Sequence, residues 1–395
     1  MTLSPSYSVR PLPEKLLVAY TVNDCHNLDK LSKVTEAVGQ GVNVLIWSFG
    51  HFHSPIEKGV DGEERIHLKF RSSQNAQNLR TFQEQLRNMG YDDVVHLASI
   101  GGWNAPHLPP GFSGEELLGA FQSVNLQFCQ NVEDDDDGKG KQSCHLWDGF
   151  DWDLEGNDNI QSPRNEFTKE CLDQMGSLSV LAKQKGLIVS MAPPESYLDI
   201  TTPHFSRFVN LTYPDDPWHL EFSYHGANVY AYVLAKWGHS IDFVFLQFYE
   251  SYSHAAYQVS QEGVEPGLFL EQYVQQLVGG NGNDNPKAGY VVNFEEDPSL
   301  DLDTQFVELP LSKLVFGFAN GWAKDNEDKV IFFPIKEVKR AYKSMKNTQI
   351  IRGMGFYDVE EEGTHDVTLS SGLNSILGIR KATLHLGEEK MGETH

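Results

Sequence analysis

Apolar residues along the chain form short continuous runs that alternate with longer stretches in which they recur every three or four positions. The short runs are rich in Val, Ile, Leu and Phe, which is typical of strands buried on both faces. The runs predict eight strands, over residues 15–23, 43–49, 93–100, 148–155, 187–192, 241–249, 314–319 and 350–357.

The longer stretches have the spacing of amphipathic helices, and several end at a glycine. They predict helices over residues 27–40, 74–89, 114–132, 164–185, 227–237, 268–278, 335–345 and 371–377. Strands that alternate with helices in this way are typical of parallel βα units. We therefore predict an α/β protein with a (β/α)₈ TIM barrel.

The length of 395 residues accommodates such a barrel, which needs about 250 residues, together with loop insertions. No stretch has the composition of a linker, so we expect a single barrel domain over residues 15–380. Residues 1–14 are predicted to be an extension and residues 381–395 a flexible tail. Two irregular stretches, residues 193–240 and 279–309, predict insertions after the fifth and sixth strands.

The fourth predicted strand, residues 148–155, carries acidic side chains on one face and apolar side chains on the other. The acidic face holds Asp151, Asp153 and Glu155. Side chains two positions apart on a strand lie about 6–7 Å from one another. Three carboxylates at that spacing cannot all ionise at low cost, so we expect one of them to keep a proton, as a general acid must.

In such barrels the functional side chains lie at the carboxyl ends of the strands. Aromatic faces there can stack on a ligand, and glycines let the backbone approach it closely. The strand ends supply these further candidate ligand-binding residues: Tyr20, Phe49, Gly101, Gly102, Trp103, Met191, Gln247, Tyr249, Glu250, Trp322, Phe356 and Tyr357.

The charge of the chain limits its partners. Acidic residues number 55 and basic residues 31, so the formal net charge is −24. Such a surface repels nucleic acid and anionic membranes, whereas a neutral polysaccharide is not repelled. Neither a membrane span nor a signal peptide is visible, so we expect a cytoplasmic protein, or a secreted one whose signal is missing from this chain.

The candidate metal ligands and thiols do not form a recognisable motif. The chain has 15 histidines but no His-x-x-x-His or Cys-x-x-Cys pair, so we expect no metal and no cofactor. Cys129 and Cys144 flank an acidic run at 134–141 and could pair in an oxidising compartment. With only Cys25 and Cys171 besides, buried free thiols are the interpretation we favour, and the acidic run is interpreted as a solvated loop.

The stretch Asp148-Gly149-Phe150-Asp151-Trp152-Asp153-Leu154-Glu155 resembles the Asp-Gly-x-Asp-x-Asp-x-Glu signature of the family 18 glycoside hydrolases, the chitinase family. Ser99-Ile100-Gly101-Gly102 resembles the Ser-x-Gly-Gly motif of the same family. Gln247-Phe248-Tyr249-Glu250 resembles its Met/Gln-x-Tyr-Asp/Asn motif, with Glu250 as a longer carboxylate.

Two features depart from the family or distinguish branches within it. The eighth strand lacks the tryptophan that forms the floor of the central sugar subsite in the family. Phe356, Tyr357 or Trp322 would have to supply that surface. Only residues 321–333 separate the seventh strand from its helix, which leaves no room for the additional α+β domain that many members carry. In outline the chain therefore resembles the single-domain, plant-type chitinases.

The resemblance implies a retaining mechanism in which the substrate assists its own cleavage. Glu155 would protonate the glycosidic oxygen while the substrate's N-acetyl carbonyl attacks the anomeric carbon. Asp153 would orient the acetamido group, Asp151 would modulate Asp153 by sharing a proton, and Tyr249 would hold the acetamido oxygen. Asp148 is expected to fix the start of the strand. Chitin or chitooligosaccharides would be the substrate, and we expect a monomer.

Two other functions stay open at this point. The family includes lectin-like members that have lost catalysis, and the altered eighth strand favours that alternative, although Glu155 and both aspartates are present. A hydrolase of another N-acetylglucosamine polymer, such as an N-glycan core or peptidoglycan, would carry the same motif.

Overall fold

A computed structural model gives the fold of the chain. It describes residues 9–22, 31–54, 66–70, 76–127, 145–157, 159, 161–209, 227–251, 253–279, 287–324, 330–345 and 350–379. Cys25, Cys129, Cys144 and the acidic run at 134–141 lie outside the described residues, as do parts of the predicted helices at 27–40, 74–89 and 114–132.

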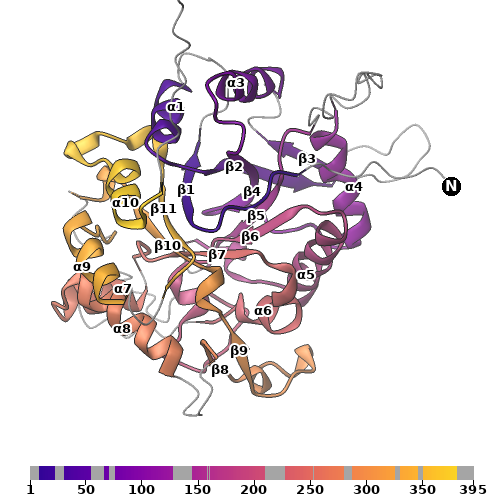
Figure 1. Cartoon of the computed structure of the whole chain (residues 1–395). Coiled ribbons are helices and arrows are strands. Elements are labelled where there is room, and N and C mark those ends of the chain that lie inside the picture. Colours follow the sequence, from indigo (N-terminus) through magenta and orange to yellow (C-terminus); the bar gives the residue numbers. More distant parts are fainter. Residues whose placement is uncertain are drawn as a thin grey trace, which may run out of the picture.

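Eight parallel strands form a closed barrel at the centre of the molecule (Figure 1). Around the barrel the order is β1, β2, β4, β5, β6, β7, β10 and β11, and β11 pairs again with β1. Their bounds are β1 Leu16–Thr21, β2 Val44–His53, β4 Val95–Gly102, β5 Gly149–Leu154, β6 Ile188–Met191, β7 Phe243–Gln247, β10 Leu314–Ala319 and β11 Gly353–Tyr357. This arrangement confirms the predicted (β/α)₈ barrel.

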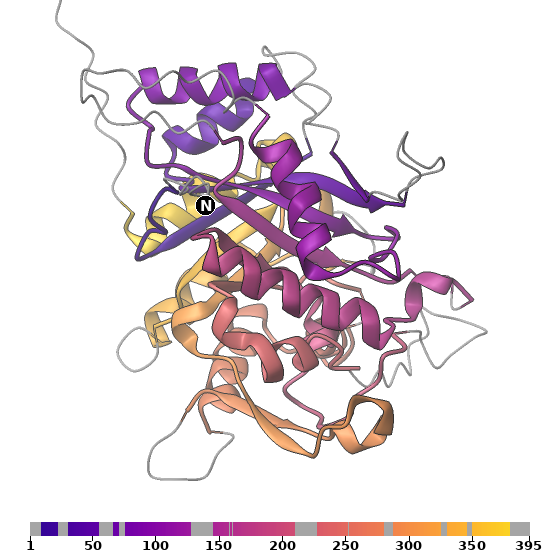
Figure 2. The same cartoon turned by 90° about the vertical axis from the view of Figure 1, so that its right-hand side faces the viewer.

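Helices surround the strands, and neighbouring helices such as α4 and α5 pack side by side (Figures 1 and 2). Their bounds are α1 Ser32–Gly39, α3 Ala76–Asn88, α4 Gly114–Asn125, α5 Lys169–Gln184, α6 Ala231–Trp237, α7 His254–Ala256, α8 Pro266–Gly279, α9 Ile335–Met345 and α10 Leu369–Leu377. Capping side chains set some starts: Thr168 accepts from the Cys171 N–H, so α5 begins five residues later than predicted. No helix in the described ranges is long and apolar enough to cross a membrane.

The described residues form two antiparallel hairpins that were not predicted, one continuous with the barrel sheet and one a separate sheet. β2 continues to His53 and pairs with β3 (His67–Phe70). β8 (Gly289–Val292) pairs with β9 (Gln305–Glu308) inside the second insertion, which the sequence had indicated to be irregular. Four-residue strands contain too few positions for alternation to be recognised, which explains why both hairpins were missed.

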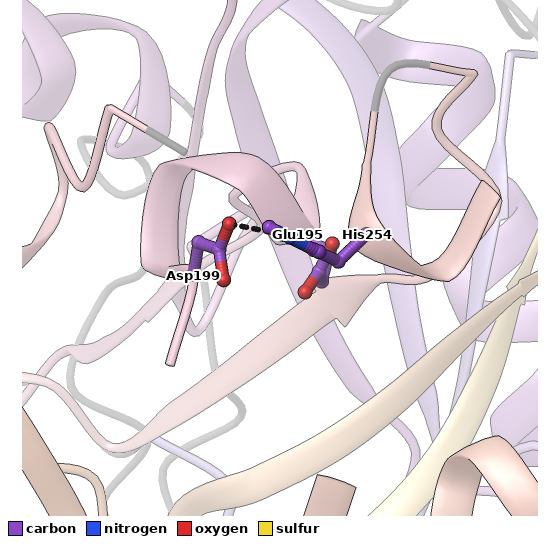
Figure 3. Close-up of side chains that lie close together, drawn as sticks. All are labelled: Glu195, Asp199 and His254. Atoms are coloured by element: carbon purple, nitrogen blue, oxygen red, sulfur yellow. Dashed lines mark hydrogen bonds and ion pairs between the residues drawn. The ribbon is translucent and has the colours of Figure 1, made fainter. Parts of the chain in front are cut away.

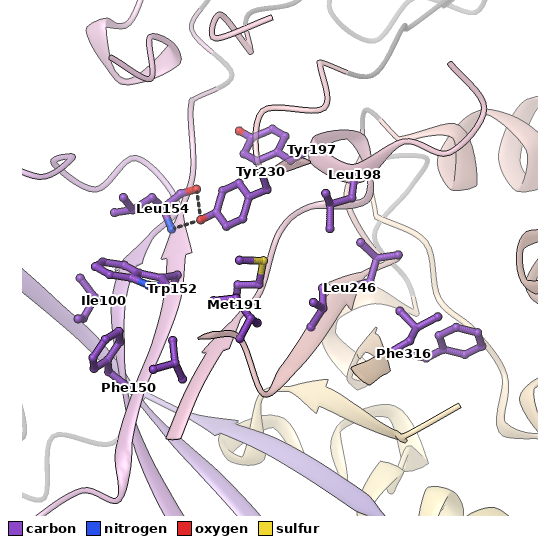
Figure 4. Packing of buried hydrophobic residues seen from close by; sticks show 14 of the residues in the cluster. Ile100, Phe150, Trp152, Leu154, Met191, Tyr197, Leu198, Tyr230, Leu246 and Phe316 are labelled. Carbon is purple, nitrogen blue, oxygen red and sulfur yellow. Dashed lines mark hydrogen bonds between the residues drawn. The ribbon is translucent and has the colours of Figure 1, made fainter. Parts of the chain in front are cut away.

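Side chains of the barrel strands alternate between two apolar layers. Inward-facing residues such as Val18, Ile46 and Phe245 fill the barrel interior. Outward-facing residues pack beneath the helices, where Phe150, Trp152 and Leu154 lie in the same layer (Figure 4). The predicted division of β5 into an apolar and an acidic face is therefore confirmed, and the acidic face points into the barrel. Cys171 is a buried free thiol, as favoured from the sequence.

Candidate active site

Asp151 lies inside the barrel and accepts hydrogen bonds from hydroxyl groups on three other strands. Tyr20 donates to Oδ2 at 2.7 Å, Ser99 donates to Oδ2 at 3.1 Å and Ser190 donates to Oδ1 at 2.6 Å. Register explains two of these contacts, since Ser99 and Ser190 stand directly opposite Asp151 on β4 and β6. Burial raises the pKa of Asp151 to about 6, although the three hydrogen bonds favour its charged form.

Asp153 stands two positions further along β5 and is 3% exposed. The Gln247 amide donates to Asp153 Oδ1 at 2.9 Å, to the Ala192 carbonyl at 2.7 Å and, more weakly, to Glu155 Oε1 at 3.4 Å. Burial, followed by the negative charges of Glu155 and Asp151, raises the pKa of Asp153 well above its ordinary value. Asp153 is therefore protonated more readily than an ordinary aspartate, and its protonated form can donate a hydrogen bond.

A cavity of about 690 Å³ opens above these carboxylates at the carboxyl ends of the strands. Its lining includes both Asp153 and Glu155. The predicted residues that the structure brings together around the cavity are Phe49, Trp103, Asp153, Glu155, Gln247, Tyr249, Glu250, Trp322 and Tyr357. Asp151 and Tyr20 lie deeper in the barrel, hydrogen-bonded to one another, and do not line the cavity.

One wall of the cavity is a contiguous set of aromatic rings. Tyr249 and Tyr357 stack with their centroids 6.4 Å apart and their planes inclined by 25°. Trp322 meets both rings edge-on, each at 6.4 Å, and its indole N–H donates to the Tyr357 carbonyl at 3.1 Å. Tyr357, and not a tryptophan, is therefore the aromatic residue that the eighth barrel strand contributes to the cavity. Burial, then the charges of Asp153 and Glu155, raise the pKa of Tyr249, so its phenol stays a donor.

Gly101 and Gly102 lie beside the cavity and do not line it. Both have positive φ angles, +121° and +98°. A Cβ atom on Gly101 would come within 2.4 Å of the Asp153 carbonyl oxygen, and one on Gly102 within 3.0 Å of the Phe49 ring. The glycines therefore let β4 approach β5 and Phe49 closely, while the next residue, Trp103, is 60% exposed at the cavity mouth.

Met191 and Phe356 lie elsewhere, which corrects their predicted place in the site. Both are completely buried in the outer apolar layer, between the barrel and the helices. Figure 4 shows Met191 near Trp152, its partner in register on β5. Alternation explains the result, because the inward-facing neighbours on β6 and β11 are Ser190 and Tyr357.

Some site residues were not identified from the sequence. Ser190, which donates to Asp151, was not singled out, and Ser99 was noted only as the first position of the Ser-x-Gly-Gly motif. Tyr197 lines the cavity and its phenol oxygen accepts from the Gly156 N–H at 2.9 Å, which fixes the backbone just after Glu155. The phenol of Tyr230 accepts from the Leu154 N–H at 2.8 Å and donates to the Leu154 carbonyl at 3.0 Å. Side chains alternate between the inside and the outside of the barrel along each strand, and applying this alternation to polar residues as well could have indicated the two serines.

Asp148, at the opposite end of β5, is a buried structural anchor. Its carboxylate accepts from the Arg10 guanidinium at 2.8 Å, the Arg10 N–H at 3.0 Å, the His96 N–H at 2.9 Å and the His145 ring at 3.1 Å. Burial by itself would raise the pKa of Asp148, but the His145 hydrogen bond and the charge of Arg10 hold it well below its usual range.

Sequence and structure comparisons identify similar folds. No family model matches the chain, and a search of curated proteins gives no match. Among solved structures, the catalytic domain of a family GH18 chitinase from the fern Peteris ryukyuensis has 13% identity and a TM-score of 0.50, with 92% of this chain and 99% of that chain covered. A hyperthermophilic chitinase domain from Pyrococcus furiosus has 12% identity and a TM-score of 0.49, with 95% and 99% covered. At such identity the similarity shows the fold alone.

Proposed function

We propose that this protein is a family 18 glycoside hydrolase that cleaves β-1,4-linked N-acetylglucosamine polymers. One observation carries the proposal: Asp153 and Glu155, two positions apart on the inner face of the β5 end, both line one cavity with an aromatic wall. The complete Asp-Gly-x-Asp-x-Asp-x-Glu signature and the barrel fold shared with the fern chitinase support it.

Glu155 is the general acid in this proposal. It protonates the glycosidic oxygen while the carbonyl oxygen of the substrate's own N-acetyl group attacks the anomeric carbon. The glycosidic bond breaks, an oxazolinium ion forms, and water then opens that ion with Glu155 as the base. Because the anomeric carbon is inverted twice, the product keeps the configuration of the substrate.

The neighbours of Glu155 position the acetamido group. Protonated Asp153 donates to it, passes its proton to the Asp151 carboxylate as the oxazolinium ion forms, and the resulting negative charge on Asp153 stabilises the positive charge that develops on the oxazolinium nitrogen. Tyr249 donates from its phenol to the acetamido oxygen. Gln247 fixes the side chains of Asp153 and Glu155 relative to one another. The aromatic wall of Tyr249, Tyr357 and Trp322 provides the flat surface on which a pyranose ring stacks.

The test is hydrolysis of chitin oligosaccharides by the wild-type protein and by Glu155→Gln, with the anomers followed by NMR. We expect the wild type to release the β-anomer first and the variant to lose at least about 100-fold in rate, as removal of a general acid does. Glu115→Gln is the matched control, because Glu115 is exposed on α4 and outside the cavity.

The remaining outcomes separate the alternatives. Oligosaccharide binding without cleavage in both proteins would replace the hydrolase with a lectin-like function, which the tyrosine in place of the eighth-strand tryptophan favours. Cleavage of N-glycan cores or peptidoglycan fragments in preference to chitin would reassign the polymer. Undiminished activity of Glu155→Gln would rule out Glu155 as the acid.

A further inference from the structure

A second group of ionisable side chains lies behind the cavity wall, on the loops that follow β6 and β7. It consists of Glu195 and Asp199, on one short turn, and His254, at the start of α7 (Figure 3). Glu195 and Asp199 are completely buried, and the His254 side chain is 20% exposed. One donor atom from each lies within 4.8 Å of the other two.

Most polar atoms of the group have partners, but one does not. His254 Nδ1 lies 2.5 Å from Asp199 Oδ2, and the Thr201 hydroxyl donates to Asp199 Oδ1 at 2.6 Å. Glu195 Oε2 accepts weakly from the Ala255 N–H at 3.4 Å, whereas Glu195 Oε1 is buried and has no hydrogen-bond partner within the described part of the chain. A buried carboxylate oxygen left unpaired is costly, so we expect this oxygen either to carry a proton or to face a cation.

The surroundings of Glu195 add negative charge and a second unpaired polar group. Asp199 and Glu250 raise the pKa of Glu195, after burial itself, and among the described residues no lysine or arginine forms an ion pair with Glu195. Among the described residues the buried phenol oxygen of Tyr273 also has no hydrogen-bond partner, and burial, followed by the charge of Glu195, raises the Tyr273 pKa. Two unpaired oxygens therefore belong to the same buried region.

We propose that Glu195, Asp199 and His254 bind one divalent transition-metal ion, and that zinc fits this donor set best. Two carboxylates and one imidazole are ligands that zinc accepts, with a fourth tetrahedral position left open. Two tetrahedral ligands at about 2.0–2.2 Å from zinc lie about 3.3–3.6 Å apart. The donor atoms of the group lie within 4.8 Å of one another, so side-chain rotations that move them by about 1 Å close the group around an ion.

The ion would join two loops that both form the cavity. Pro194 and Tyr197 flank Glu195 on the first loop, and Tyr249 and Glu250 precede His254 on the second; all four line the cavity. Ser196 already connects the loops, since its hydroxyl donates to Glu250 Oε2 at 2.8 Å. The ion would therefore hold the two loops together, and the inference stands whether or not the protein hydrolyses chitin.

No local spacing could have indicated this site. The ligands come from two loops, with His254 more than 50 residues after Asp199. The absence of a His-x-x-x-His or Cys-x-x-Cys pair led us to expect no metal, and the proposal revises that expectation.

The experiment is zinc titration by calorimetry of the full chain, free of affinity tags and stripped with EDTA, with bound metal measured by mass spectrometry after desalting. We expect one zinc ion per chain in the wild type, a melting temperature that rises with zinc, and loss of both effects in Glu195→Gln and His254→Gln. His204→Gln is the matched control, because it removes a histidine from the more exposed His204–Glu296 pair and should keep the zinc response.

Two results would overturn the proposal. The first is a wild type that retains no zinc after desalting and whose melting temperature does not respond; Glu195→Gln would then equal or exceed the wild type in stability, which identifies a proton on Glu195. The second is a zinc ion that persists in both Glu195→Gln and His254→Gln, which places the metal elsewhere. Because His254 is partly exposed, its variant keeps the test valid if Glu195→Gln does not fold.

Discussion

The two ends of β5 carry buried aspartates with opposite properties. Asp148, at the start of the strand, is surrounded by N–H donors and by the positive charge of Arg10, and its pKa is lowered. Asp153, near the end, has one amide donor and two carboxylate neighbours, and its pKa is raised. Both are almost completely buried, so burial does not distinguish them. The difference lies in their partners.

This contrast separates a stabilising carboxylate from a reactive one. A carboxylate whose acceptor sites are all filled by donors has nothing left to offer a ligand, and it fixes Arg10 and the start of β5 to the barrel. A carboxylate crowded by like charges is held in a state that a bound ligand can relieve. Substitution of Asp148 should therefore change mainly the stability of the protein, and substitution of Asp153 mainly its turnover rate.

The largest effect is expected at the anchored end. Asp148→Ala leaves Arg10 and the His96 N–H without their partner, and loss of one member of a buried ion pair costs about 3–5 kcal/mol of the free energy of unfolding. Urea denaturation followed by circular dichroism measures that cost. Hydrolysis at a temperature well below the melting point should stay near the wild-type rate.

The pH dependence of stability gives a second measure of Asp148. Its pKa in the folded state lies below the ordinary 3.8, so its stabilisation is present above that pH and is lost as the pH falls further. Acid should therefore destabilise the wild type more steeply than the variant. Asp242→Ala, which removes a more exposed partner of Lys183, is the control with a smaller expected cost. If Asp148→Ala unfolded with the same free energy as the wild type, the proposed difference between the two ends of β5 would be wrong.

At the reactive end, Asp153→Asn should reduce the turnover rate and preserve stability. We expect a loss of about 100- to 1,000-fold in kcat, the usual result of removing one preorganised electrostatic contact from an active site. Asparagine carries no charge and so avoids the cost of burial and of the neighbouring charges of Glu155 and Asp151, which should keep the free energy of unfolding at or above that of the wild type. Steady-state kinetics and urea denaturation of the same preparation measure both.

Asp173→Asn is the control for Asp153→Asn, because Asp173 lies on α5 outside the barrel, where it accepts from Tyr232 and lysines. It should leave kcat unchanged. If Asp153→Asn were strongly destabilised yet fully active at low temperature, Asp153 would be a stabilising residue like Asp148, and the two ends of β5 would not differ in function.

The sequence predicted the barrel because parallel strands buried on both faces form apolar runs that are easy to recognise. It also predicted the acidic face of β5, since six residues that alternate between apolar and acidic show which positions share a face. Parity failed on β6, where Met191 follows the run Leu-Ile-Val-Ser and only Ser190 indicates the inward face. The same ambiguity affected Phe356 and Tyr357, which are adjacent aromatics on opposite faces of β11.

Long-range contacts could not be predicted. The hydroxyl donors to Asp151 come from three strands, and their identity depends on the register in which those strands pair. The group formed by Glu195, Asp199 and His254 depends on how two loops pack after the barrel has closed. Neither register nor loop packing leaves a local pattern in one sequence.

The smallest expected effect lies between the two ends, at Asp151. Tyr20→Phe removes the phenol that donates to Asp151 Oδ2 and keeps the ring contacts with Phe245 and Tyr357. Because that hydrogen bond stabilises the charged carboxylate, its loss raises the Asp151 pKa further above about 6. A hydrogen bond worth about 0.5–1.5 kcal/mol corresponds to a shift of about 0.4–1 pH unit.

The readout is the acidic limb of the profile of kcat/KM against pH, which should move to higher pH in Tyr20→Phe while the plateau changes little. The sign follows from the proposed chemistry: only a charged Asp151 can accept the proton that Asp153 gives up, so activity falls as Asp151 takes up a proton from the solvent. Tyr232→Phe removes an equivalent phenol–aspartate hydrogen bond on α6 and should leave the limb in place. An acidic limb that stays fixed in Tyr20→Phe would mean that Asp151, despite its position between the two ends, belongs with Asp148 as part of the scaffold.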